Sequence, residues 1–272
     1  MPDATGTDRG RTARPPLSHV VGDALRDVTE KRLLELVRAE PVPEHLAIIM
    51  DGNRRFAAAE GLDVQDGHAR GRDTLEKLLD WCLDLGIRIL TVYALSTENL
   101  ARPAGEVDGL MDLFDRALRD IATDPRVHRH RIRVRVIGDR SVLPARVQEA
   151  VGIAERATEG YQEYRYNVAL GYGGRDEIVR AIRALAREVK DGTLAPEAID
   201  SADVARHLYT ADLPDPDLIL RTSGEERISN FLLWQSAYSE LYFSDVLWPG
   251  LTRLEFLRAI RTFQLRHRRY GT

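Results

Sequence analysis

The spacing of apolar residues alternates between helical and strand patterns from residue 17 onward. Helical spacing predicts helices at 17–40, 69–85, 105–122, 142–160, 176–190, 202–209 and 252–268. Short apolar or alternating runs predict strands at 45–50, 87–95, 132–137, 166–170, 218–220 and 241–243. This order predicts an α/β fold with a mostly parallel sheet of about six strands and helices on both faces.

The chain shows no linker or composition shift, so we expect one domain over residues 17–272 that begins with helix 17–40. Residues 1–16 are mostly Pro, Gly, Thr, Asp and Arg, which predicts a disordered tail. The apolar stripe of helix 17–40, including Val20, Val21 and Leu25, indicates packing on the body of the protein. Docking of that stripe on a membrane surface is the alternative.

Composition narrows the class of protein. The 272 residues are 43% hydrophobic, and 39 basic against 43 acidic residues give a net charge of −4, which argues against nucleic acid as a partner. The single cysteine, Cys82, fits a reducing compartment. No apolar run has the length of a membrane span. We therefore expect a cytoplasmic protein, with peripheral membrane contact left open.

Polar and glycine-rich clusters follow the predicted strands, where an open parallel sheet binds its ligands. These clusters are Asp51-Gly52-Asn53, Ser96 to Asn99 with Arg102, Gly138-Asp139, Gly171 to Arg175, and Arg221 to Gly224. In the first cluster, Asp51 offers oxygen to a hard cation and Gly52 permits a tight turn. Arg54 and Arg55 suit phosphate oxygens. A strand-ending turn with solvated charges is the alternative.

Two further segments predict anion binding. Gly67-His68 precedes the helix at 69–85, where backbone N–H groups bind anions, although a packing histidine is the alternative. Arg221 and Arg227 can wrap a diphosphate, and Ser229-Asn230 either joins them or caps the next helix. Glu240 follows an aromatic stretch and needs a partner or a metal. P-loop, dinucleotide and nucleophile-elbow motifs are absent from the sequence.

Together these segments resemble the cis-prenyltransferase family, which includes undecaprenyl and dehydrodolichyl diphosphate synthases. The resemblance extends from His45 to the C-terminus and is carried by residues 45–55, 67–68, 91–99, 173–175, 217–225, 227–235, 240–243 and 247–249. The aspartate-rich D-D-x-x-D motif of trans-prenyltransferases is absent.

The resemblance implies roles for individual residues. Asp51 and Glu240 would place Mg²⁺, Asp51 would assist ionisation, and Asn53 would assist proton removal. Arg55 and His68 would hold the allylic diphosphate, whereas the diphosphate of isopentenyl diphosphate would lie on Arg221, Arg227 and Ser229. Ser96 and Arg102 would lie over the reacting ends. Further implied substrate contacts are Gly52, Arg54, Phe56, Thr97, Glu98 and Asn99. A hydrophobic product tunnel and a homodimer built around residues 227–245 are implied as well.

Some positions depart from the bacterial pattern of the family. They are Arg54 in place of glycine, Phe56 in place of tryptophan, Val64 in place of arginine, and Leu95 and Leu100 in place of aromatic residues. Arg54 and the segment 171–177 resemble the archaeal and eukaryotic branch, whose archaeal members often start from geranylgeranyl diphosphate. Arg269-Tyr270-Gly271 resembles the R-x-G tail of that branch, and a frayed basic helix end is the alternative.

The sequence thus predicts an enzyme that adds isopentenyl diphosphate in Z configuration to geranylgeranyl or farnesyl diphosphate, giving a long-chain lipid carrier precursor. Tyr164 and Tyr166 are candidates to narrow its tunnel. The alternatives are a short-chain synthase that stops at C15–C20 and a non-catalytic partner subunit. A nucleic-acid or membrane module using Arg266, Arg268 and Arg269 is a third class, which the net charge disfavours.

Overall fold

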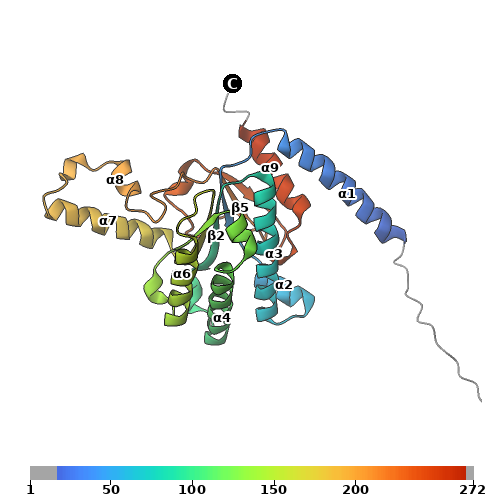
Figure 1. Ribbon diagram of the computed structural model, residues 1–272, viewed down its shortest axis with the longest axis horizontal. Coiled ribbons are helices and arrows are strands. Elements are labelled where there is room, and N and C mark those ends of the chain that lie inside the picture. The colour runs from blue at the N-terminus through green and yellow to red at the C-terminus, as the bar shows by residue number, and fades with distance from the viewer. Residues whose placement is uncertain (1–16, 268–272) are drawn as a thin grey trace, which may run out of the picture.

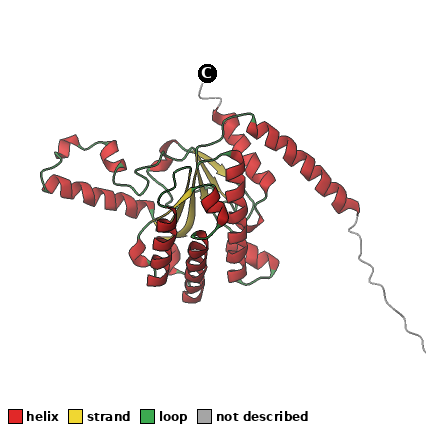
Figure 2. Cartoon of the chain, viewed as in Figure 1, coloured by secondary structure: helices red, strands yellow, loops and turns green. Residues whose placement is uncertain are grey.

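The computed structural model describes the backbone of residues 17–267 and the side chains of residues 27–266. The predicted tail at 1–16, the side chains of Val20, Val21 and Leu25, and Arg268 to Gly271 lie outside the described residues. Residues 17–267 form one α/β domain, in which the strands lie at the centre and the helices surround them (Figure 2).

A six-stranded sheet forms the centre of the fold, in the order β3-β4-β2-β1-β5-β6. Every pair of neighbouring strands is parallel. The strands are β1 His45–Ile49, β2 Ile89–Ser96, β3 Ile132–Ile137, β4 Tyr164–Tyr172, β5 Leu218–Arg221 and β6 Glu240–Phe243. The predicted parallel sheet is confirmed, with each boundary within two residues of its predicted position.

The two faces of the sheet bury different partners. Alternate residues such as Leu46 and Ile48 face the larger core, against α3 Val64–Leu85, α4 Ala104–Ile121, α6 Ala145–Thr158 and α9 Arg253–His267. The intervening residues, such as Ala47 and Ile49, face a smaller core. There Phe231 and Leu232, which lie in a loop, join the core in place of a long helix. The prediction of helices on both faces therefore holds mainly for one face.

The helices differ from the prediction at α2, α3, α5 and α8. Two short helices were not predicted, α2 Asn53–Glu60 and α5 Pro125–Arg129. Helix α3 begins at Val64, five residues earlier than predicted. Its first turns contain Gly67 and Gly71, which weaken helix propensity and hide the periodicity. Helix α8 is also shorter than predicted and spans only Ser201–Ala205.

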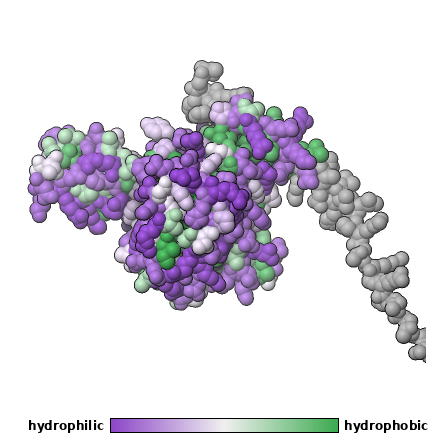
Figure 3. All heavy atoms as spheres, viewed as in Figure 1, coloured by the Kyte–Doolittle hydropathy of each residue, from purple (hydrophilic) through white to green (hydrophobic). Residues whose placement is uncertain are grey.

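Two helical segments extend away from the body (Figure 1). Helix α1, Leu17–Arg38, packs on α9 near its C-terminal end, and Val37 is fully buried there. Helices α7, Gly174–Lys190, and α8 form an arm on the opposite side. Apolar residues lie among polar ones on this arm (Figure 3), including the exposed Val179 and Ile182. Among the described helices, none is long and apolar enough to cross a membrane.

Candidate active site

A polar cleft of about 910 Å³ opens at the carboxyl ends of β1, β2 and β5. It brings together most of the residues that the sequence predicted for the site. These are Asp51, Gly52, Asn53, Arg54, Arg55, His68, Ser96, Glu98, Asn99, Arg102, Arg221 and Ser229. Four predicted residues lie outside the lining of the cleft, namely Phe56, Thr97, Arg227 and Glu240.

The turn after β1 requires glycine at position 52. Gly52 has φ 114°, a left-handed conformation that side chains disfavour, and a Cβ there would lie 3.0 Å from the Leu247 backbone. Helix α2 begins directly after this glycine without a side-chain cap. The backbone N–H groups of its first turn therefore face the cleft beside Asp51, in an arrangement that attracts anions.

Asp51 and Arg221 form the charged centre of the cleft. Arg221 Nη2 donates to Asp51 Oδ2 at 2.7 Å and its Nη1 donates to Ser229 Oγ at 2.7 Å. Arg55 lies 3.5 Å from the other Asp51 oxygen. Burial alone would raise the pKa of Asp51, but hydrogen bonds from Arg221 and Ser223 hold that pKa below its usual range. Asp51 is therefore a carboxylate at neutral pH.

The loop that follows β5 is held in a strained conformation. Ser223, Ser229, Asn230 and Leu232 all have positive φ, which is uncommon for residues other than glycine. Such strain persists where the surrounding structure fixes it, and it clusters at functional sites. The loop wraps Arg221, whose Nη1 also donates to the carbonyl oxygen of Arg227.

A second cluster of cations surrounds Glu106 on α4, which the sequence analysis missed. Glu106 Oε1 lies 3.0 Å from Arg102 Nη1 and 3.4 Å from His68 Nε2, and Oε2 lies 3.8 Å from Arg54 Nε. The Glu106 side chain is only 9% exposed. Burial lowers the pKa of His68, although Glu106 opposes that shift. The spacing of Arg102 and Glu106, four residues apart, was the sequence signal that could have found it.

Asn53 presents an unpaired acceptor between these clusters. Its Oδ1 is buried and has no hydrogen-bond partner among the described residues. Two glycines of α3 permit its close approach, because a Cβ on Gly71 would lie 2.2 Å from Asn53 Oδ1 and one on Gly67 would lie 2.5 Å from the Asn53 carbonyl. Asn167 Oδ1 and Gln235 Oε1 are also buried without a partner among the described residues, so it is the place of Asn53 in the lining of the cleft that marks it for contact with a ligand.

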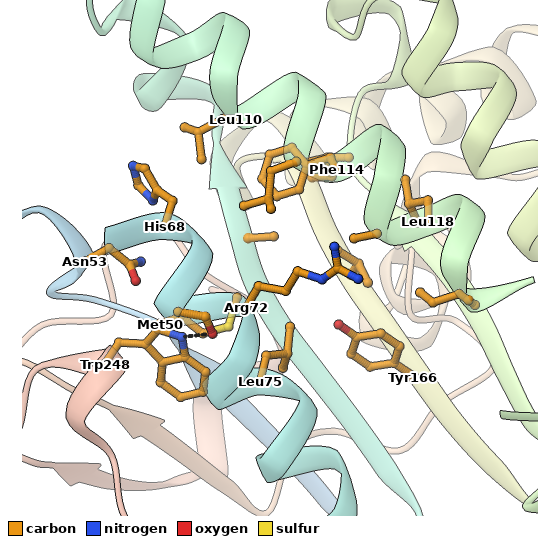
Figure 4. A pocket seen from close by; sticks show the side chains of 17 residues that line it. Met50, Asn53, His68, Arg72, Leu75, Leu110, Phe114, Leu118, Tyr166 and Trp248 are labelled. Carbon is orange, nitrogen blue, oxygen red and sulfur yellow. Dashed lines mark hydrogen bonds between the residues drawn. The ribbon is translucent and has the colours of Figure 1, made fainter. Parts of the chain in front are cut away.

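An apolar cavity of about 100 Å³ continues from the cleft, between the sheet and helices α3 and α4 (Figure 4). The cleft and the cavity share Met50, Asn53, His68, Ala94 and Leu110. Beyond them the lining is almost entirely apolar and includes Leu75, Leu113, Phe114, Leu118, Ile121, Tyr166 and Val168. Tyr166 lies in this lining, as the sequence analysis expected, whereas Tyr164 does not.

Within one chain Glu240 lies far from Asp51, although the family resemblance implied that these two carboxylates place Mg²⁺ together. Glu240 begins β6 and lies level with Leu46, whereas Asp51 follows the opposite end of β1. Asp51 comes five residues after Leu46, which is about 16 Å along an extended chain. The Glu240 carboxylate instead pairs with Arg266 at 3.2 Å.

One local prediction was wrong, and one alternative does not hold. Gly67 and His68 do not precede a helix start but lie inside α3, so the backbone N–H of Gly67 is bonded to the Asp63 carbonyl rather than open to an anion. Asn230 does not cap a following helix. It caps α7 instead, because its Oδ1 accepts from the Arg175 N–H at 2.8 Å. Its Nδ2 donates to Glu98 Oε1 and ties the strained loop to the end of β2.

The family profile described as "Putative undecaprenyl diphosphate synthase" matches residues 49–271. The chain belongs to the cis-prenyltransferase family. The predicted resemblance is thereby confirmed, and the chain is a prenyl-transferring enzyme. Two similar relatives carry the name "tritrans,polycis-undecaprenyl-diphosphate synthase (geranylgeranyl-diphosphate specific)". The one from Thermoplasma acidophilum is 50% identical, over 94% of this chain and 99% of the relative. The one from Methanopyrus kandleri is 51% identical, over 96% and 98%.

Solved structures of cis-prenyltransferases share the fold. Lavandulyl diphosphate synthase from Lavandula x intermedia, in complex with dimethylallyl diphosphate, has a TM-score of 0.79 and 38% identity, over 82% of this chain and 95% of that one. A probable undecaprenyl diphosphate synthase from Campylobacter jejuni has a TM-score of 0.68 and 37% identity, over 85% and 100%.

Proposed function

We propose that this cis-prenyltransferase adds isopentenyl diphosphate to geranylgeranyl diphosphate, with Mg²⁺, and makes a long-chain polyprenyl diphosphate. The observation that carries the proposal is the direct opening of the charged cleft into the apolar cavity. Diphosphates need cations and N–H donors, whereas a growing hydrocarbon needs an apolar wall. The donor follows the names of the archaeal relatives, with farnesyl diphosphate as the alternative.

The basic residues around the cleft divide the two diphosphates between them. Arg55, His68 and the start of α2 hold the allylic diphosphate in this proposal, with Arg54 and Arg102 beside it. Arg221, Arg227 and Ser229 hold the diphosphate of isopentenyl diphosphate. Arg221 is 4% exposed, and its Nε is buried without a partner among the described residues. A phosphate oxygen can accept a hydrogen bond from such an unpaired N–H group.

The residues present fit a divalent cation that arrives with the diphosphates. Among the described residues no three His, Cys, Asp or Glu side chains form a metal cage. Mg²⁺ commonly uses only one or two carboxylates together with substrate phosphates and water. Asp51 is ionised and its side chain is 31% exposed in the cleft, so it suits this role. The cation would supply charge stabilisation for the leaving diphosphate.

The residues around the reacting carbons carry the remaining steps. As the C1–O bond of the allylic diphosphate breaks, the arginines stabilise the negative charge that the diphosphate gains. Ser96 ends β2 and Arg102 follows the next turn, so both lie over the reacting ends. Holding the double bond of isopentenyl diphosphate close to C1 then lets the new C–C bond form. Asn53, which lines the cleft, assists the proton loss from isopentenyl diphosphate that completes the condensation, and the diphosphate released from the allylic substrate accepts that proton.

The product chain grows into the apolar cavity. Each buried CH₂ group contributes about 0.8 kcal/mol, so a lengthening chain is held more tightly as it enters. A short-chain synthase would need a closed cavity floor, and a non-catalytic subunit would lack Asp51 or Arg221. The chain keeps both residues, and its cavity continues past Phe114 to Ile121.

We also propose a homodimer in which Glu240 acts from the second copy. Within one chain Glu240 lies too far from Asp51, and β6 is the edge of the sheet. Mixing Asp51→Ala chains with Glu240→Ala chains tests this arrangement. Mixed dimers recover activity if each site combines residues of both copies, whereas the absence of recovery would refute the shared site. We propose a cytoplasmic enzyme that releases its product at the membrane surface.

A donor competition tests the proposed function. The purified protein is incubated with labelled isopentenyl diphosphate, Mg²⁺ and geranyl, farnesyl or geranylgeranyl diphosphate in turn, and the products are sized. We expect long Z-chains, with the highest kcat/KM for geranylgeranyl diphosphate. Chelation with EDTA should abolish incorporation, and added Mg²⁺ should restore it. No incorporation with any donor would refute the proposed activity, and short products alone would refute the long-chain assignment.

A further inference from the structure

The apolar cavity runs from the cleft toward the amino ends of the strands. Along α4 its lining passes from Leu110 through Phe114 to Ile121, and along β4 it passes from Leu170 back to Tyr166. Eleven helical residues separate Leu110 from Ile121, which gives a path of about 16 Å. A growing chain that is anchored at the cleft must therefore advance between α3 and α4.

One charged side chain interrupts this apolar path. Arg72 is the only arginine or lysine among the described residues that line the cavity. It projects from α3, and Figure 4 shows its side chain crossing toward α4, with the guanidinium group between Leu118 and Tyr166. Arg72 is not one of the proposed substrate-binding arginines, and it does not line the cleft.

Two carboxylates hold the Arg72 guanidinium in place. Nη2 donates to Asp120 Oδ2 on α4 at 2.6 Å, and Nε lies 3.3 Å from Glu76 Oε1, one turn along α3. The Arg72 side chain is 29% exposed and Asp120 is 62% exposed. The pair thus links the two helices across the outer side of the cavity, where one end of the link reaches solvent.

We propose that the Arg72–Asp120 pair is a polar bar that limits the length of the product. This proposal rests on the proposed function and adds a specificity-determining residue to it. A hydrocarbon end that reaches the guanidinium must displace it from Asp120 or strip it of water, and either event opposes further elongation. Because a solvent-exposed ion pair is weak, the bar slows elongation at a certain length rather than blocking it outright.

The fixed wall of the cavity would not by itself limit the length of the product. Tyr166 is fixed on β4 and is 6% exposed, so it forms part of the wall at every chain length. Arg72 is different because its long, flexible side chain can move between two positions. When the Arg72 guanidinium is paired with Asp120, it narrows the path of the growing product. When the pair breaks, a gap opens between α3 and α4.

The test is the product distribution of Arg72→Leu, which removes the charge and keeps an apolar surface. Wild type and variant are incubated with geranylgeranyl diphosphate and excess labelled isopentenyl diphosphate, and products are separated by length. We expect the share of label in products longer than the main wild-type product to rise about fivefold, equivalent to about 1 kcal/mol. Arg119→Leu is the matched control, because Arg119 lies on α4 outside the cavity lining and pairs with Asp115 and Glu149.

Asp120→Asn provides a second, independent variant on an exposed residue. It leaves Arg72 in place but weakens its tether, so we expect a shift in the same direction that is smaller than that of Arg72→Leu. If Arg72→Leu does not fold, Asp120→Asn decides the question. Unchanged or shorter products from these variants, or an equal shift in Arg119→Leu, would refute the proposed role of the Arg72–Asp120 pair. Failure of the proposed function is distinguishable, since the wild-type protein would then incorporate no label.

Discussion

The two ends of strand β1 carry polar residues that serve different purposes. At the amino end, His45 is fully buried and both ring nitrogens are satisfied. Nδ1 lies 2.7 Å from the Pro214 carbonyl, to which it donates, and Nε2 lies 2.8 Å from Thr91 Oγ1. At the carboxyl end, Asp51 is partly exposed and its neighbour Asn53 keeps an unpaired buried oxygen. The His45 ring nitrogens are paired within the protein, whereas Asn53 Oδ1 at the other end of the strand has no partner among the described residues.

This difference separates structural from chemical roles more clearly than residue type does. A buried polar group whose partners all lie in the protein contributes to the fold, whereas one that lacks a partner costs stability, which a ligand can restore where the group lines a cleft. Among the described residues Asn53, Arg221, Asn167 and Gln235 each have an unpaired buried atom, and of these only Asn53 and Arg221 line the cleft. The contrast predicts that substitutions at Asp51 affect rate and that substitutions at His45 affect stability.

The largest expected effect is on the rate of Asp51→Ala. Loss of its carboxylate removes the proposed metal ligand and a partner of Arg221, so kcat should fall by about 10²- to 10³-fold. Steady-state turnover with isopentenyl diphosphate and geranylgeranyl diphosphate measures this fall. Asp51→Asn, which keeps an acceptor for Arg221 without the charge, should lose a similar factor while its thermal unfolding stays close to wild type.

Asp191→Ala is the matched control for the charge, because this exposed aspartate ends α7 on the projecting arm. Its turnover should equal that of wild type. If Asp51→Asn turned over substrate at the wild-type rate, the charge of Asp51 would have no part in the mechanism. The two ends of β1 would then not differ in role.

His45 should influence stability through pH. Burial lowers its pKa from 6.5 to about 4, against the opposing effects of Pro214 and Asp217. The unfolded chain then binds a proton that the folded chain rejects, so stability is fully present above pH 6.5 and is lost as pH falls toward 4. The pKa difference corresponds to roughly 3 kcal/mol. Urea unfolding of wild type at pH 7 and pH 4.5 measures the loss.

His45→Gln should flatten this pH dependence, even if it lowers stability at pH 7. The same loss in His45→Gln between pH 7 and pH 4.5 would assign the acid sensitivity to other groups. Turnover at pH 7 in folded His45→Gln should stay within about twofold of wild type, as expected for a residue remote from the cleft.

The fold was largely predictable because the strands are short, apolar and separated by clear turn signals. The run His45 to Met50 is buried on both faces, so its apolar character is continuous and easy to recognise. Helix α2 escaped prediction because it has eight residues and charged positions in its first turn. The early start of α3 was hidden by Gly67 and Gly71, which are required by the approach of Asn53 rather than by the helix.

The site was predictable where its residues directly follow strands and less so elsewhere. Asp51, Ser96 and Arg221 stand at strand ends, and parallel pairing brings them together. Glu240 was misplaced because its role came from the family resemblance, although its position before the predicted strand 241–243 already puts it at the amino end of a parallel sheet. Glu106 was missed because its partners, Arg54 and His68, come from two other helices, and only tertiary packing brings all three together.

A smaller effect, on the binding of substrate, is expected for Glu106→Gln. This variant tests the contrast between paired and unpaired buried groups at the cleft itself. Glu106 is nearly buried and is partnered by two arginines and His68, so it is a positioning residue for Arg54, His68 and Arg102. Without its charge these side chains lose their common anchor, and the KM for the allylic diphosphate should rise about tenfold, or 1.4 kcal/mol. The KM for isopentenyl diphosphate should change little, because Arg221 and Ser229 do not contact Glu106.

The pH profile distinguishes positioning from a general loss of structure. Glu106 raises the pKa of His68, so in Glu106→Gln that pKa falls further and any acid limb of kcat/KM set by His68 moves to lower pH. Asp108→Asn, an exposed residue two positions along α4, removes the same charge and should change neither quantity. A lower allylic KM in Glu106→Gln would mean that the carboxylate competes with the diphosphate for these cations rather than arranging them for it.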